Sequence, residues 1–237
     1  MFETLNRREF TLLMSLGFAQ VLTGAPPPET NQPDYLTSQY NKYARRYGIT
    51  DKKFSFNDKI FEFKKKQYAI NTERFCFVNY DYPAAKQRFF IFNKDATVQL
   101  SSLASHGINT GNETSCLFSN TDSSYQSSLG IYVTGTPYVG NFGPSINLHG
   151  LSYGNNLAFD RRIVIHGADY CSTDHIAKYG FLGRSLGCIA LSKKNMISAY
   201  QILTPGTIVI AKQDTKKTLT EALIPPTQEE KTENRLP

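Results

Sequence analysis

The sequence has no tryptophan, and its 237 residues include only three methionines and four histidines. No two of its four cysteines form a Cys-x-x-Cys pair, which excludes a zinc ribbon and a thioredoxin-like motif. Long apolar runs are also absent. The stretch Phe10–Leu22 has about 13 residues, whereas a membrane-spanning helix needs about 20. We find no internal repeat, so a repeat architecture is not indicated.

The composition that remains is that of a folded protein. Hydrophobic residues make up 40% of the chain and charged residues 19%, which is too apolar for a disordered protein. Without a leader and a polar tail, roughly 180 residues remain, which suits one domain with a real core. The aromatic residues are 16 phenylalanines and 14 tyrosines, and both types favour strands.

The chain is basic, with a formal net charge of +6 and a pI of about 9.0. A basic protein favours contact with an anionic partner. No nucleic-acid recognition motif accompanies the charge, so we expect no nucleic-acid partner. The cluster Lys64–Lys66 is more typical of a solvated face. An anionic polymer such as a cell wall fits the charge equally well.

The first 25 residues have the features of an export signal. Arg7 and Arg8 precede the short apolar run Phe10–Leu22, as in twin-arginine signals. We therefore expect delivery to the periplasm or cell envelope, with no stable membrane span after the leader is removed. A cytosolic amphipathic N-terminal helix is the alternative interpretation.

We divide the chain into four parts: a probable export signal over residues 1–25, a linker and helical segment over 26–73, a catalytic domain over 74–212 and a flexible tail over 213–237. In the second part, Asp34 is placed to cap a helix over 35–47, which Gly48 ends. The tail is polar and contains Pro225-Pro226, which favours flexibility.

The third part is rich in short segments with the composition of strands. They are Arg74–Tyr82, Gln87–Asn93, Ala96–Ser101, Leu129–Thr134, Ser145–His149, Arg161–His166 and Thr207–Lys212. Clusters of glycine and asparagine separate them. Two helices are expected among them, Thr173–Tyr179 capped by Ser172 and Lys193–Leu203 capped by Ser192. The pattern predicts a mainly β fold, a β-sandwich with a few short helices.

The chemistry is expected between Arg161 and Ser192. An apolar β-branched run ends in His166-Gly167, and a glycine-flanked loop ends in Cys188. A thiol is a useful nucleophile only as the thiolate, so it needs a nearby base, which His166 can supply. The 22 residues between them allow the chain to leave one strand and return alongside it. A nucleophilic Cys188 must stay free, so at most one disulfide forms among the other cysteines.

Six ordered motifs carry a family resemblance: His106-Gly107, Phe118-Ser119-Asn120, Ser127-Ser128-Leu129-Gly130, Tyr138-Val139-Gly140, His166-Gly167 and Gly183-Arg184-Ser185-Leu186-Gly187-Cys188. With these motifs the chain resembles the murein L,D-transpeptidase catalytic domain family, the YkuD-like cysteine transpeptidases, over roughly residues 74–212. The resemblance implies an L,D-transpeptidase-like fold in which Cys188 and His166 are catalytic. We also expect the backbone amides of Gly187 and Cys188 to point at a developing oxyanion, with Ser185 in the same loop.

Two departures from the family pattern concern substrate binding. Many members carry Arg or Asn two residues after the cysteine, where this chain has Ala190, and some carry His at the position of Leu186. Arg184 is therefore the candidate partner for a substrate carboxylate, which it can hold with two hydrogen bonds. An ordinary structural contact of Arg184 is the alternative. The resemblance also places Gly167, His106 and Tyr138 at the substrate, and no metal is expected.

The function that the resemblance implies is acyl transfer on peptidoglycan stem tetrapeptides, without a cofactor. Cys188 would form an acyl-thioester, which an amine acceptor converts to a cross-link. Water would instead give an L,D-carboxypeptidase, a hydrolase that trims the terminal D-Ala, and the sequence does not separate the two. A catalytically silent wall-binding module and a host-directed cysteine hydrolase are more distant alternatives.

Overall fold

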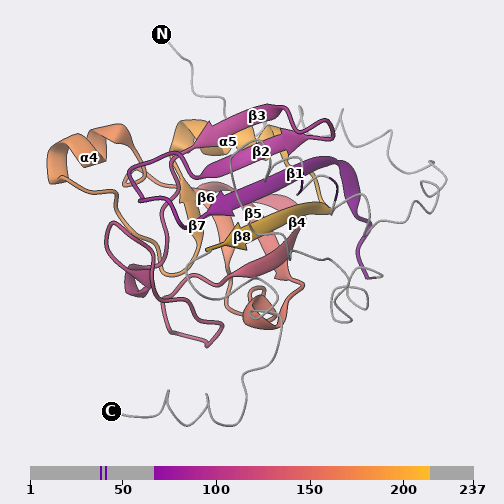
Figure 1. Ribbon diagram of the computed structural model, residues 1–237, viewed down its shortest axis with the longest axis horizontal. Helices are drawn as coiled ribbons and strands as arrows, with labels where there is room; N and C mark the ends of the chain where they lie inside the picture. The colour runs from indigo at the N-terminus through magenta and orange to yellow at the C-terminus, as the bar shows by residue number, and fades with distance from the viewer. Residues whose placement is uncertain (1–37, 39–40, 42–66, 214–237) are drawn as a thin grey trace. The chain divides into compact units, whose positions relative to one another are not determined.

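A computed structural model describes residues 38, 41 and 67–213 (Figure 1). The predicted export signal, almost all of the predicted helix at 35–47 and the tail beyond Gln213 lie outside the described residues. The strands are β1 (Asn71–Asn79), β2 (Phe89–Asn93), β3 (Val98–Ser102), β4 (Gly130–Gly140), β5 (Gly143–Gly150), β6 (Val164–Gly167), β7 (Ile189–Leu191) and β8 (Thr207–Lys212). The helices are η1 (Ile108–Thr110), η2 (Tyr153–Asn155), α4 (Thr173–Tyr179) and α5 (Lys193–Ile202). No helix among the described residues is long and apolar enough to cross a membrane.

The eight strands form one continuous hydrogen-bonded sheet in the order β3-β2-β1-β8-β4-β5-β6-β7. Two neighbouring pairs are parallel, β1 with β8 and β6 with β7, and the other pairs are antiparallel. Helix α5 packs against β5 and β6. The predicted mainly β fold with a few short helices is confirmed.

Most predicted elements are present with small shifts at their ends. Helix α4 has the predicted bounds, and the Ser172 side chain accepts a hydrogen bond from the His175 amide. Helix α5 begins as predicted after Ser192, which accepts from Asn195. Strand β4 continues past the predicted Thr134 to Gly140, and its register shifts between Thr134 and Pro137. This irregularity accommodates a glycine and a proline that strands normally disfavour.

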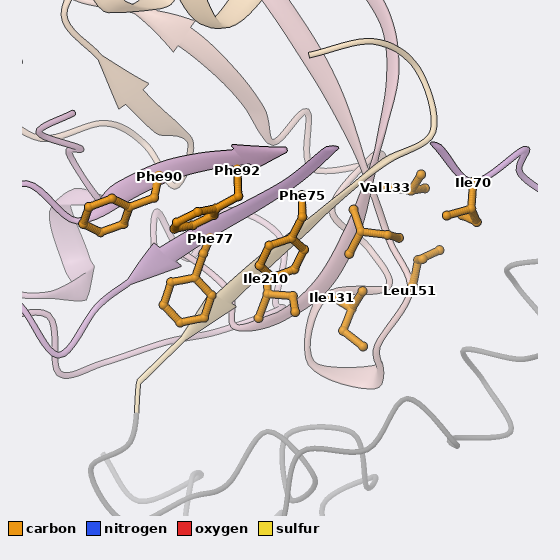
Figure 2. Close-up of a cluster of buried hydrophobic side chains, with 10 residues drawn as sticks. Ile70, Phe75, Phe77, Phe90, Phe92, Ile131, Val133, Leu151 and Ile210 are labelled. Atoms are coloured by element: carbon orange, nitrogen blue, oxygen red, sulfur yellow. The ribbon is translucent and has the colours of Figure 1, made fainter. Parts of the chain in front are cut away.

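Aromatic side chains build the core on one face of the sheet, which Figure 2 shows. Two rows of directly opposed residues cross β2, β1, β8 and β4: Phe90, Phe77, Ile210 and Ile131 in one, and Phe92, Phe75, Ile208 and Val133 in the other. All are buried. Burying each side chain stabilises the fold by about 2 kcal/mol, and opposed aromatic and β-branched pairs add to this. This core fixes the sheet that carries the site.

The β6–β7 pair determines where the chemistry lies. The chain leaves β6 at Gly167, passes through α4 and returns as β7 in parallel beside β6. The register pairs Ile165 with Ile189 and His166 with Ala190. Cys188 is therefore the residue immediately before β7, as the predicted return of the chain alongside its own strand requires. All four cysteines are free.

Candidate active site

The register of the strands sets where Cys188 and His166 lie. Tyr138 of β4 opposes Ser145 of β5, Ser145 opposes His166 of β6, and His166 opposes Ala190 of β7. Directly opposed residues share a face, and residues two apart on a strand share it as well. Cys188 comes two residues before Ala190, where the backbone bends, so it lies beside the start of β6 with its Sγ against the Arg162 carbonyl. Ala190 itself is fully buried in a cluster with Ala168, Cys171 and Leu182, so it lies in the core.

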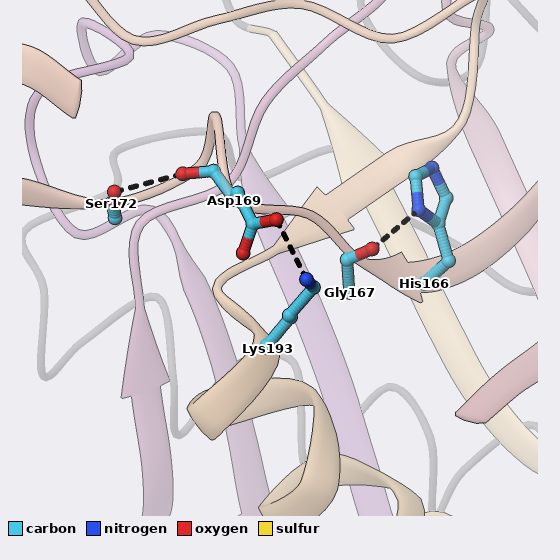
Figure 3. Close-up of polar contacts among 5 residues, drawn as sticks. All are labelled: His166, Gly167, Asp169, Ser172 and Lys193. Carbon is cyan, nitrogen blue, oxygen red and sulfur yellow. Dashed lines mark hydrogen bonds and ion pairs between the residues drawn. The ribbon is translucent and has the colours of Figure 1, made fainter. Parts of the chain in front are cut away.

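The imidazole of His166 is buried and oriented by its own backbone. Nδ1 lies 3.1 Å from the carbonyl oxygen of Gly167, so Nδ1–H donates to that carbonyl (Figure 3). This tautomer leaves Nε2 with a lone pair to accept a proton. Burial lowers the pKa of His166, which the Gly167 carbonyl partly opposes. The ring of Phe142, from the β4–β5 turn, lies 4.7 Å from the imidazole between ring centres.

The thiol of Cys188 is half-buried, and its Sγ lies 3.6 Å from the carbonyl oxygen of Arg162. That contact requires a protonated sulfur as the donor. Burial raises the pKa of Cys188, while the Val164 amide and the Arg161 guanidinium act to lower it. The raised pKa favours the neutral thiol, whereas a nucleophilic Cys188 must react as the thiolate.

The loop before Cys188 is held in a conformation that glycine permits. Gly187 has a φ of +118°, and a Cβ at this position would lie 2.9 Å from the carbonyl oxygen of Gln126. The Gly187 amide donates to Ser185 Oγ at 3.1 Å, and Ser185 Oγ donates to the Cys188 carbonyl at 2.7 Å. The Gly187 amide, predicted for the oxyanion loop, is thus already bonded within the loop.

Two of the upstream motifs meet at this loop through one hydroxyl group. Ser127 Oγ accepts a hydrogen bond from the Gly107 amide at 3.0 Å and donates to the Gly187 carbonyl at 3.1 Å. Gly107 is required here, because a Cβ at this position would lie 2.3 Å from the Tyr125 carbonyl oxygen. The spacing of these motifs therefore reflects the packing of three segments around the loop that precedes Cys188.

The His106 side chain is fully buried, away from any surface that a substrate reaches in this structure. Its Nδ1 lies 2.6 Å from Arg88 Nη2, and its Nε2 lies 3.1 Å from the Gly111 carbonyl oxygen. Arg88 is also fully buried and donates to the carbonyl of Ala104. Burial and the Arg88 charge lower the pKa of His106 to about 4. His106 therefore supports the loop from inside the protein.

The other predicted substrate residues lie in different places. Arg184 Nη1 donates to Asn112 Oδ1 at 2.5 Å and to the Gly111 carbonyl at 3.3 Å. Tyr138 is partly exposed at the His166 face. Gly167 packs against the start of α5, where a Cβ would lie 3.2 Å from Lys193 Cα. Its carbonyl orients His166, a role in which the backbone matters and the side chain does not.

Sequence reasoning did not identify Arg161. This residue ends the turn before β6, and its guanidinium donates to the carbonyl oxygens of Ser119 and Gln126 at 2.8 and 2.7 Å. It is the side chain whose positive charge lowers the pKa of Cys188. The available signal was the pair Arg161-Arg162 directly before the strand that ends in His166.

A cavity of about 690 Å³ lies just beyond the ends of β6 and β7, next to Gly167 and Leu191. It is lined by Ala168, Asp169, Tyr170, Ser172, Asp174, His175, Lys178, Tyr179, Ser192 and Lys193. Asp169 and Lys193 form an exposed ion pair at 2.6 Å, which Figure 3 includes. Within residues 38, 41 and 67–213, no group of three His, Cys, Asp or Glu side chains is placed to hold a metal ion.

Comparison with known proteins identifies one family. The family model of the L,D-transpeptidase catalytic domain matches residues 47–211. No curated protein sequence matches the chain.

Among solved structures, the chain is similar to an L,D-transpeptidase from Mycobacterium smegmatis, with 15% identity, a TM-score of 0.37 and coverage of 59% of this chain and 58% of that one. An L,D-transpeptidase from Mycobacterium tuberculosis H37Rv gives 14% identity, a TM-score of 0.40 and coverage of 59% and 57%. The chain thus spans less than two thirds of the length of these structures. These TM-scores are too low to support a structural argument, so the family assignment rests on the family model.

Proposed function

The chain belongs to the L,D-transpeptidase catalytic domain family, and on that premise we propose that it is a peptidoglycan L,D-transpeptidase with Cys188 as its nucleophile. The observation that carries the proposal is the β6–β7 register. It runs the strand that follows Cys188 alongside the strand that contains His166, and the Gly167 carbonyl leaves His166 Nε2 as a proton acceptor. Nucleophile, base and orienting group are the parts that thiol-based acyl transfer needs.

The first step converts an amide to a thioester. The Cys188 thiol gives its proton to His166 Nε2, and the sulfur attacks the carbonyl carbon that follows the L-centre of a diaminopimelate-type residue in a stem tetrapeptide. When the C–N bond breaks, His166 returns the proton to the leaving amine of D-Ala. The acyl group remains on Cys188. In the second step, an acceptor amine attacks the thioester while His166 takes a proton from it. The C–S bond breaks, the new amide is the cross-link, and the proton returns to the Cys188 sulfur.

The oxyanion of the tetrahedral intermediate needs hydrogen-bond donors. Because the Gly187 amide is bonded to Ser185, we assign this role first to the Cys188 amide. Ser185 then acts as the residue that holds the loop, through its contacts with Gly187 and Cys188. The Gly187 amide is a second donor only if it exchanges Ser185 for the substrate.

Arg184 is our candidate for a carboxylate of the stem peptide. Its Nη1 holds Gly111 and Asn112, and among the described residues its Nε–Nη2 edge has no hydrogen-bond partner. That edge has the paired N–H geometry that matches a carboxylate. Tyr138 contributes from the same face as His166.

The leader forms a separate part of the proposal. Arg7 and Arg8 before Phe10–Leu22 support export by the twin-arginine route to the periplasm or cell envelope. Replacing both arginines with lysine in a reporter fusion should retain the reporter in the cytoplasm. Unchanged delivery to the periplasm would remove the twin-arginine route from the proposal.

The test of the proposed function is to incubate the purified protein with tetrapeptide muropeptides and identify the products by mass spectrometry. A transpeptidase gives cross-linked dimers with loss of one D-Ala, and the Cys188→Ala variant gives none. Tripeptides without dimers would replace transpeptidation with L,D-carboxypeptidase activity. Binding of peptidoglycan without any product in the wild type would indicate a silent wall-binding module.

A further inference from the structure

The Arg161 guanidinium is held in place by neutral groups. Nη1 donates to the Ser119 carbonyl at 2.8 Å, and Nη2 donates to the Gln126 carbonyl at 2.7 Å and to Ser124 Oγ at 3.2 Å. The side chain is half-buried, yet the ion pairs found among the described residues do not include it. The charge of Asp122 also acts on Arg161, but among the described residues no carboxylate forms an ion pair with it.

The position of Arg161 indicates that the anion it faces is the thiolate of Cys188. A Cβ built on Gly187 would lie 3.5 Å from Arg161 Nη2, so the guanidinium lies against the loop that presents Cys188. Three ionisable side chains from different segments interact electrostatically with Cys188: Arg161 from the turn before β6, Tyr80 after β1 and Tyr170 after β6. Of these three, only the arginine carries a positive charge at neutral pH.

We propose that Arg161 is the positioning residue that stabilises the thiolate form of Cys188, by supplying a permanent positive charge beside the sulfur. The proposal rests on Cys188 being the nucleophile, and it does not depend on the substrate. His166 accepts the proton, but as a buried neutral imidazole it provides no positive charge before the transfer. When the S–H bond breaks, the negative charge on sulfur therefore has Arg161 as its counter-charge.

Arginine suits this position because its geometry is fixed by more than one acceptor. The three hydrogen bonds anchor both terminal nitrogens without neutralising the charge. They also connect the charge to the segment between Ser119 and Gln126, which Ser127 continues to the Gly187 carbonyl. A lysine would keep the charge at this place but lose part of the anchoring.

The pH dependence of Cys188 alkylation by iodoacetamide tests the proposal without any substrate. The modified peptides are resolved by mass spectrometry, and exposed Cys116 serves as the internal reference in each sample. Near neutral pH, Arg161→Gln should slow alkylation of Cys188 relative to Cys116 by about tenfold, the lower end of the effect of an adjacent opposite charge. The rate should recover as the pH is raised. Arg161→Lys should keep most of the wild-type rate.

The matched control is Arg74→Gln, which removes the same charge from β1 and should leave the profile unchanged. Two results would overturn the proposal: an Arg161→Gln profile that matches the wild type, or equal losses in the Gln and Lys variants at every pH. The second result, with a lower melting temperature in both, would make Arg161 an anchor of the loop only. A normal alkylation response in a protein that forms no muropeptide product would refute the proposed function and leave the role of Arg161 intact.

Discussion

Buried His106 should make the protein acid-sensitive, and the size of the effect follows from its contacts. Both nitrogens of the neutral ring are hydrogen-bonded: Nδ1 accepts from Arg88 Nη2, and Nε2–H donates to the Gly111 carbonyl. Protonating Nδ1 would direct a second N–H at the Arg88 guanidinium inside the protein. The folded state therefore resists taking up this proton, whereas the unfolded state does not.

The pKa of His106 falls from 6.5 to about 4 on folding, with burial as the first cause and the Arg88 charge as the second. Because the folded pKa is the lower one, stability is complete above about 6.5 and is lost as the pH falls toward 4. One pKa unit corresponds to about 1.4 kcal/mol, so the contribution of this histidine is about 3 kcal/mol across that window.

Urea unfolding of the wild type and of His106→Asn between pH 7 and pH 4 measures this contribution. Asn keeps an oxygen that accepts from Arg88 but cannot be protonated. The variant should be less stable near neutral pH, and the difference in unfolding free energy should shrink by about 3 kcal/mol toward pH 4. The control His175→Gln changes a half-buried histidine of α4 and should preserve the wild-type slope. A His106→Asn difference that stays constant with pH would refute the reasoning.

Three further changes test the active site. Ser127→Ala removes the acceptor of the buried Gly107 amide and the donor to the Gly187 carbonyl. The free energy of unfolding in urea should therefore fall by about 1–3 kcal/mol. Arg184→Ala should lower kcat/KM on a tetrapeptide by the equivalent of about 1.5–3 kcal/mol, and Arg184→Lys should recover only part of this loss. A lower melting temperature of Arg184→Ala together with altered Cys188 labelling would show a structural role instead. Because burial lowers the pKa of His166 and its neutral form is the base, the acid limb of the kcat/KM profile should lie below 6.5, and a limb above that value would argue against His166 as the base.

The regular elements of this fold were accessible to sequence reasoning because their local chemistry agrees with the final structure. Ser172 and Ser192 cap their helices, and β8 begins with four β-branched residues and is buried along its whole length. Strand β7 was missed, because the three residues Ile189–Leu191 follow the nucleophile loop without a turn signal. Its existence depends on pairing with β6, a contact that only the folded chain provides.

The candidate site was likewise only partly predictable from the sequence. The motifs predicted Cys188 and His166 as the catalytic pair, and the register pairs the strand after Cys188 with the strand that contains His166. They gave no indication that the Gly187 amide is bonded to Ser185 or that His106 lies inside the protein, because both facts depend on tertiary packing. Arg161 was missed for a physical reason: its nearness to the loop before Cys188 arises only when folding brings that loop against the turn.

If Cys188 carries the acyl group, intact-protein mass spectrometry during turnover of a stem tetrapeptide should detect it. We expect a transient mass increase equal to the peptide without its terminal D-Ala. Proteolytic mapping should assign this increase to Cys188, and hydroxylamine should remove it, as expected for a thioester. Cys116→Ser should leave the adduct in place. An adduct on any other residue, or product formation by Cys188→Ala at the wild-type rate, would contradict the account.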